Sequence, residues 1–348
     1  MLNIADVLVE LCSLQGPAGF ESEAAHRAKT LLEQYVDETW TDAMGNVIGV
    51  RRCGKEGATK LLFDAHIDEI GLIITGAEEG FLRFAALGGL DQRVMPAACI
   101  RILTEPPRFG VVCVMPPHVL KKEDTEKGIK IEDMYIDAGL SQDEAVCAVP
   151  PGTPAVIAGG AQRFGECYIC GKALDDRAGF VSILRALEML GDLRLDVDLY
   201  VIASVQEEVG TRGAAPGAFS IDPDYCVVVD VGHAKTNDSK ATEVDEVLGG
   251  GVIISVGPNI NSKLADMSVR LAKEHDIKYQ VDVEPGGDSG TNARAIQIAR
   301  GGVATAIYGI PLRYMHNTNE VASLDDIESA ARLLYEFAVS MEGGQRNA

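Results

Sequence analysis

Apolar and polar positions along this chain follow two periods, one typical of helices and one typical of buried strands. Two segments near the N-terminus, 4–14 and 21–36, have the period of surface helices and flank a Gly-Pro turn. Three more helices are expected, at 178–190, 262–275 and 324–341. Short runs rich in β-branched residues predict strands at 46–51, 60–66, 199–205, 225–230, 278–283 and 303–311. This alternation predicts an α/β fold, with helices on the faces of a doubly wound mixed sheet.

The pattern changes between Gly71 and Gly160. Short β-like runs alternate there with proline-rich turns, and a charged stretch at 121–130 predicts an exposed loop. The β-like runs lie at 100–103, 110–115 and 155–158. This texture predicts a small β-rich domain, residues 71–160, inserted into an α/β domain made of residues 1–70 and 161–348.

Titratable side chains collect where the predicted strands end. Glu207 and Glu208 follow the strand at 199–205, and adjacent carboxylates repel each other unless a cation neutralises them or one holds a proton. Ligands of open α/β sheets bind outside the carboxyl ends of the strands, so groups from several strands should meet there. The groups in such positions are His66, Asp68, Asp175, Asp176, Glu207, Glu208, Asp230 and His316.

This set of side chains is suited to a divalent metal. It contains histidines and several carboxylates but no cysteine, which favours a hard or borderline cation over a structural thiolate site. Paired carboxylates also occur in glycoside hydrolases, but that chemistry does not need His66, Asp230 and His316 at strand ends. The sequence therefore predicts a metal centre.

Composition narrows the class of protein further. The chain has 348 residues, 47% of them hydrophobic and 24% charged, the balance of a globular protein large enough for more than one domain. Its net charge of −21, from 31 Lys and Arg against 52 Asp and Glu, opposes binding to nucleic acid or an anionic membrane. No apolar run approaches a membrane span and the N-terminus lacks a basic leader, so a cytoplasmic protein is expected. Cys167 and Cys170 have ligand-like spacing, but without a second pair we predict buried thiols.

Five segments form an ordered set of motifs: 65–71 (AHIDEIG), 172–177 (KALDDR), 207–210 (EEVG), 230–234 (DVGHA) and 314–317 (YMHN). Together they resemble the tetrahedral (TET) aminopeptidases, dinuclear metallopeptidases that include glutamyl and deblocking aminopeptidases. The resemblance covers nearly the whole chain. It implies a cytosolic enzyme that removes N-terminal residues from short peptides, holds two divalent metal ions per subunit, zinc or cobalt, and assembles into a homododecamer.

The resemblance also implies roles for the metal ligands. His66 and Asp230 would hold one metal ion, and Glu208 and His316 would hold the other. Asp175 would bridge the two ions, because a short carboxylate can fix their separation without slack.

The resemblance implies that the remaining site residues transfer a proton or orient a ligand. Glu207 would be the general base, since its neighbour is a ligand, and Asp68 would orient the histidine ring two residues before it. Asp176 stays a rival for the bridging role, because either aspartate of the pair could face the metals. Two positions depart from the family pattern: Asn292 stands where Asp is usual, and Asn317 stands where Ser or Thr is usual.

Other functions fit parts of this pattern. A dinuclear amidohydrolase or deacylase acting on a non-peptide amide would need the same metal centre. A glycoside hydrolase or a non-catalytic assembly protein would not. Metal content distinguishes these functions. Two equivalents of bound metal would support a dinuclear hydrolase, and no bound metal would support a glycoside hydrolase or an assembly protein.

Overall fold

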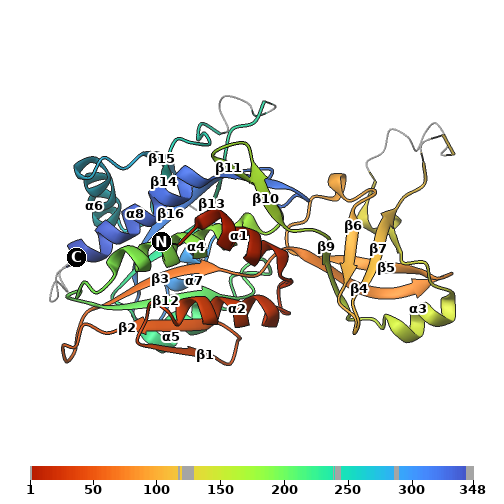
Figure 1. Cartoon of the computed structure of the whole chain (residues 1–348), viewed down its shortest axis with the longest axis horizontal. Helices are drawn as coiled ribbons and strands as arrows, with labels where there is room; N and C mark the ends of the chain where they lie inside the picture. Colours follow the sequence, from red (N-terminus) through yellow and green to blue (C-terminus); the bar gives the residue numbers. More distant parts are fainter. Residues whose placement is uncertain are drawn as a thin grey trace.

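The computed structural model consists of a large α/β body and a small closed barrel, which lie side by side in Figure 1. It describes residues 2–116, 118–119, 129–237, 239, 244–285 and 290–341. The loop expected at 121–130 lies almost wholly outside these residues. Among the residues described, no helix has the length and apolar character needed to cross a membrane.

An eleven-stranded sheet forms the centre of the α/β body. Its strands are β1 (Glu38–Thr41), β2 (Val47–Arg51), β3 (Lys60–His66), β10 (Ala161–Phe164), β11 (Tyr168–Gly171), β12 (Asp198–Ser204), β13 (Tyr225–His233), β14 (Val252–Val256), β15 (Tyr279–Val283), β16 (Ala304–Arg313) and β17 (Glu320–Ser323). They lie in the order β1-β2-β12-β3-β13-β16-β17-β11-β10, and β14 and β15 extend from β16. The central strands β12, β3, β13 and β16 are parallel, whereas β2, β14 and β17 pair antiparallel with them, so the sheet is mixed as predicted.

Helices cover both faces of this sheet. They are α1 (Ile4–Ser13), α2 (Ser22–Leu32), α4 (Leu174–Leu190), α5 (Ala214–Ile221), α6 (Ser262–Glu274), α7 (Ala293–Ile296) and α8 (Leu324–Ser340). Because side chains alternate along a strand, Leu61 and Phe63 of β3 enter the core under α1, α4 and α8, while Leu62 enters the core under α5 and α7. Because helices cover both faces of the central strands, most residues of these strands are apolar.

The small barrel is formed between β3 and β10. Its strands are β4 (Gly71–Glu78), β5 (Phe81–Leu87), β6 (Cys99–Ile102), β7 (Arg108–Cys113), β8 (Tyr135–Asp137) and β9 (Pro154–Ile157), and α3 (Gln142–Ala148) lies against it. The strands close in the order β4-β5-β8-β7-β6-β9 around a core of their own, which includes Leu82, Ile100 and Ile136. Closure pairs both edges of the sheet, so this insert needs no helix layer to cover them.

Two expectations from the sequence are wrong. Asp175 and Asp176 do not end a strand, because β11 stops at Gly171 and the aspartates fall in the first turn of α4. The thiols of Cys167 and Cys170 are exposed and half-buried rather than buried, because they belong to the β10–β11 hairpin at the rim of the sheet.

Candidate metal centre

Parallel pairing brings groups from three strands to one place. His66 is the last residue of β3 and pairs with Ser204, the last residue of β12. On the other side of β3, Val228 of β13 pairs with Asp64, so Asp230 lies level with His66. The carboxyl ends of these strands therefore meet at one edge of the sheet, which is where ligands of such sheets bind.

A first group of possible ligand atoms comes from His66, Asp175 and Asp230. The three atoms lie within 4.8 Å of one another. Nε2 of His66 is 3.1 Å from Oδ1 of Asp175 and 3.8 Å from Oδ1 of Asp230. All three residues are buried, so their charges are shielded little by solvent.

A second group comes from Asp175, Glu208 and His316. Nε2 of His316 is 3.4 Å from Oδ2 of Asp175 and 3.3 Å from Oε2 of Glu208. The three ligand atoms again lie within 4.8 Å of one another. Asp175 is thus common to both groups and turns one oxygen toward each histidine.

Asp176 faces a different environment. Its Oδ1 accepts a hydrogen bond from the amide of Gly179 at 3.0 Å, inside α4. Its Oδ2 is buried and has no hydrogen-bond partner among the residues described. In the part of the chain that the structure covers, Asp176 belongs to neither group of possible ligands.

Both histidines are held so that Nε2 faces the carboxylates. Nδ1 of His66 lies 3.2 Å from the carbonyl oxygen of Asp68, and Nδ1 of His316 lies 3.0 Å from that of Gly89. A carbonyl oxygen can only accept a hydrogen bond, so each Nδ1 carries the proton. In a neutral ring the lone pair is then on Nε2, which is the arrangement of a histidine that binds a metal.

Gly88 and Gly89 follow β5 of the barrel and pass close to this centre. A Cβ on Gly89 would lie 2.6 Å from Nδ1 of His316, and one on Gly88 would lie 3.2 Å from Oε2 of Glu208. Gly88 also has a φ of +86°, which disfavours larger residues. The contact that orients His316 therefore needs a residue without a side chain, a signal that the sequence analysis missed.

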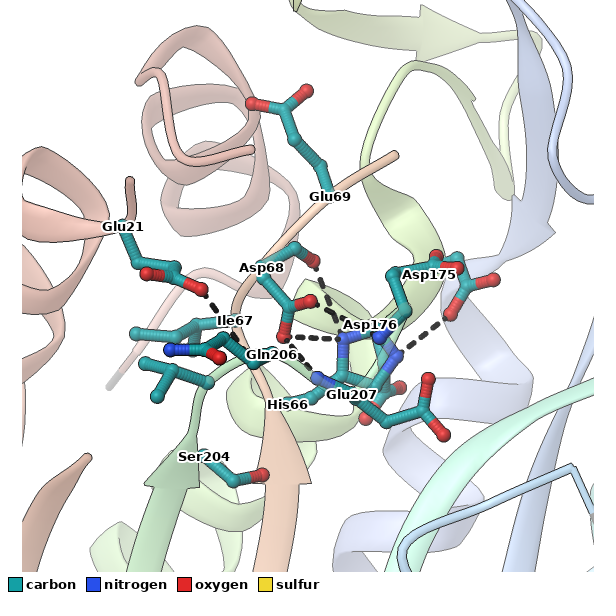
Figure 2. A network of polar contacts seen from close by, with 12 residues as sticks. Glu21, His66, Ile67, Asp68, Glu69, Asp175, Asp176, Ser204, Gln206 and Glu207 are labelled. Carbon is teal, nitrogen blue, oxygen red and sulfur yellow. Dashed lines mark hydrogen bonds and ion pairs between the residues drawn. The ribbon is translucent and has the colours of Figure 1, made fainter. Parts of the chain in front are cut away.

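Asp68 positions the two glutamates that follow β12. Its carboxylate accepts hydrogen bonds from the backbone amides of Glu207 and Glu208, each at 3.1 Å. In Figure 2, dashed lines join Asp68 to both His66 and Glu207. Asp68 approaches the His66 ring with two atoms: its carbonyl oxygen lies 3.2 Å from Nδ1 and its Oδ1 lies 3.5 Å from the same nitrogen.

Glu207 differs from Glu208 in having a buried carboxylate oxygen that accepts no hydrogen bond from the residues described. Its Oε1 is buried and has no hydrogen-bond partner among the residues described. Burial raises the pKa of this carboxyl to about 7, and Glu208 adds to the shift by repulsion. A carboxyl group with this pKa can exchange a proton near neutral pH.

The pKa values of Asp230 and His316 show that positive charge stabilises this centre. Burial raises the pKa of Asp230 well above its usual range. Hydrogen bonds to Asp175 and Glu208 raise the pKa of His316 to about 11, so its ring takes up a proton beside these carboxylates. A divalent cation in the same place would supply the charge and leave the ring neutral, as metal binding requires. The buried nitrogen and oxygen donors therefore fit a divalent metal.

Glu320 fixes the positions of two proposed ligands from behind. It is 2% exposed, and its Oε2 accepts hydrogen bonds from the amides of Leu174 and Asp175. Its Oε1 accepts one from the amide of His316 at 3.2 Å. No sequence signal singled out Glu320, because it is the first residue of the four-residue strand β17, which has no apolar run around it.

A buried ion cluster connects the segments that carry the site. The carboxylate of Glu69 contacts Nζ of Lys172 at 2.6 and 2.8 Å and Nη2 of Arg177 at 3.2 Å. All three side chains are at most 4% exposed. Arg177 also donates to the carbonyl oxygens of Leu11 and Leu14, which ties the N-terminal segment to the start of α4. The cluster therefore anchors the backbone next to Asp68 and Asp175.

We predict that Glu69→Gln lowers the free energy of unfolding by about 3–5 kcal/mol, because it leaves two cations buried without their anion. Glu10→Gln, which removes an exposed glutamate paired with Arg27, should cost less than about 1 kcal/mol. Urea unfolding of both variants makes the comparison. Similar small losses in the two would mean that the cluster does not anchor the fold.

The two groups of ligands open into one cavity of about 600 Å³. Its lining includes parts of β13, β14, β15, β16 and the segment after β15, together with the site residues His66, Asp175, Glu207, Glu208, Asp230 and His316. Asn292, one of the departures from the family pattern, lies outside this lining and is 1% exposed. It donates hydrogen bonds to Asp64 and Ser204, each at 2.8 Å, and so packs behind the ends of β3 and β12. Asn317 is half-buried next to His316.

The two histidine–carboxylate groups lie together at one edge of a mixed α/β sheet. The family model of M42 glutamyl aminopeptidases matches residues 45–333. The chain therefore belongs to the M42 peptidase family and is a hydrolase that acts on peptides.

Known relatives confirm the resemblance and the predicted fold class. A lysyl aminopeptidase of Pyrococcus furiosus is 38% identical over 309 residues, 87% of this chain and 87% of the relative. A TET aminopeptidase from the marine sediment archaeon Thaumarchaeota archaeon SCGC AB-539-E09 has a TM-score of 0.92 at 29% identity, covering 97% of this chain and 96% of its own. The TET1 peptidase of Pyrococcus horikoshii, described as able to assemble into a tetrahedron or a large octahedral shell, has a TM-score of 0.83 at 30% identity, covering 97% of this chain and 100% of its own.

Proposed function

We propose that this protein is a dinuclear metal-dependent aminopeptidase that removes N-terminal residues from short peptides. The observation that carries the proposal is the position of Asp175, whose two oxygens face two groups of possible ligands. His66 and Asp230 would hold one divalent ion, Glu208 and His316 the other, and Asp175 would contact both. Nitrogen and oxygen donors without thiolate suit zinc or cobalt.

The roles of the protein groups follow from their positions. Two divalent cations held in this centre would polarise the scissile carbonyl and lower the pKa of a water molecule. Glu207 would take the proton of the attacking water on its unpartnered oxygen and return it to the leaving amine. Asp68 would hold the backbone of Glu207 and thereby the distance over which the proton moves.

Glu207→Gln should keep the metal bound and lower kcat by about 10²–10⁴-fold, because the amide cannot accept the proton. Peptide hydrolysis and metal content of the purified variant provide the measurement. Glu10→Gln, on the exposed side of α1, serves as the control and should keep wild-type activity. Near wild-type hydrolysis by a fully metallated Gln variant would show that Glu207 is not the base.

The bridge can be tested by counting metal ions. We expect Asp175→Asn to weaken binding of both ions together, because a shared ligand couples the two occupancies, whereas His316→Ala should empty mainly one site. Metal titration of the two variants distinguishes these outcomes. Loss of one ion in both variants would assign the bridge to Asp176 instead.

We also propose that the insert at residues 71–160 mediates assembly of a homododecamer and limits access to the active site. The barrel exposes large apolar side chains, including Phe109 at 62%, Met115 at 58% and Val146 at 57%, which a neighbouring subunit could cover. The Pyrococcus horikoshii relative forms closed shells, and tetrahedral symmetry generates a dodecamer. A net charge of −21 opposes indiscriminate association, so the contacts should be specific.

Light scattering at physiological salt should therefore give the mass of a stable homo-oligomer, and the particle should cleave short peptides while sparing folded proteins. The physical reason is that a closed shell admits only chains that fit its openings. A stable monomer with full peptidase activity, or ready cleavage of folded substrates, would contradict the proposal.

A further inference from the structure

The cavity of the candidate metal centre extends across the sheet to strand β15. Asp230 on β13 pairs with Gly309 on β16, and Gly309 pairs with Ile253 on β14. Two residues further along β14, Ser255 pairs with Asp282 on β15. All five residues line the same cavity. Three strand spacings separate β13 from β15, roughly 14 Å, so the cavity has a metal end and an outer end at β15.

The outer end of the cavity is acidic. Its lining includes Asp282, the adjacent Glu284 and, from the segment before β14, Glu246. These three side chains are half-buried. Val281 and Val283, which flank Asp282 on β15, are 46% and 67% exposed. Asp282 of β15 and Glu284 just after it thus face inward while the valines face outward, the reverse of the usual pattern. Such an arrangement is expected where the inward face meets a polar or charged ligand.

Among the residues described, carboxylates outnumber basic side chains in the lining of this outer end. Burial raises the pKa of Glu284, and repulsion from Asp282 raises it further. In the described part of the lining, Arg294 is the one arginine or lysine, against the three carboxylates. The ions of the proposed centre would neutralise the carboxylates that bind them, roughly 14 Å away, and leave the outer group still acidic.

A second feature marks the cavity as a place for a ligand. Glu207, which is 8% exposed, lines the metal end, and its Oε1 has no hydrogen-bond partner among the residues described. Between the two ends, the floor is formed by Gly309 and Ile253, and a Cβ on Gly309 would lie 3.1 Å from that of Ile253. The floor is therefore low and apolar, and it leads from the reacting groups to the acidic end.

We propose that the side chain of the substrate's N-terminal residue lies along this floor and that the enzyme prefers Lys or Arg at that position. The inference rests on the proposed aminopeptidase function. The apolar stem of such a residue would contact Ile253 and Gly309, and its charged end would reach Asp282, Glu284 and Glu246. An acidic N-terminal residue would be repelled, and a short neutral one would leave the carboxylates without a partner.

The test compares kcat/KM for the p-nitroanilides of Lys, Arg, Leu and Glu with metal-loaded enzyme. We expect the Lys and Arg substrates to be cleaved fastest. In the double variant Asp282→Asn with Glu284→Gln, kcat/KM for the Lys substrate should fall by about 10–100-fold, the loss expected for hydrogen bonds to a charged group, while that for Leu stays nearly unchanged. Asp245→Asn is the matched control, because Asp245 is an exposed carboxylate next to Glu246 that does not line the cavity.

Three results would overturn the inference. The wild type could cleave the Leu or Glu substrate as fast as the Lys substrate, or the double variant could lose activity on Lys and Leu alike. Either result would leave the aminopeptidase function intact. Failure to cleave any of the four substrates with two equivalents of metal bound would contradict the proposed function, and this inference with it.

Discussion

Buried negative charge is the constraint on which the rest of this structure depends. Asp175, Asp176 and Asp230 are at most 6% exposed, and Glu207 and Glu208 lie beside them. Carboxylates packed this closely in a low dielectric cannot all stay ionised unless cations lie among them. The pKa values of Asp230 and His316 are raised, which means that both groups favour the protonated form and so reduce the negative charge. The proposed pair of divalent ions would supply positive charge and would turn a destabilising cluster of carboxylates into a reactive centre.

The protein supports this cluster mainly through backbone atoms. The carbonyl oxygens of Asp68 and Gly89 fix the two histidine rings. The carboxylates of Asp68 and Glu320 accept hydrogen bonds from the backbone amides of the proposed ligands Glu208, Asp175 and His316. Backbone groups are less mobile than side chains, so the donors are held in place before a metal or substrate arrives. Gly89 belongs to the segment that follows β5, so the barrel takes part in shaping the centre as well as extending the molecule.

The sequence was sufficient to find the side chains at the ends of parallel strands. His66 and Asp230 follow apolar runs, and the rule for open sheets brings such positions together without knowledge of the fold. Asp175 was found by its type and motif but placed wrongly, since it begins a helix. Gly89 and Glu320 were missed because their roles come from tertiary contacts: Gly89 and His316 are 227 residues apart, and no local pattern encodes such a contact. For the same reason, the sequence predicted a strand at 278–283 but gave no role to Asp282 or to Glu284, which line the cavity.

The central claim is that two metal ions share Asp175, and anomalous X-ray scattering from crystals of the zinc-loaded protein tests it most directly. The account predicts two anomalous peaks per subunit, one in contact with His66 and Asp230, the other with Glu208 and His316, and both in contact with Asp175. A single peak, two peaks bridged by Asp176, or zinc bound away from these residues would contradict it.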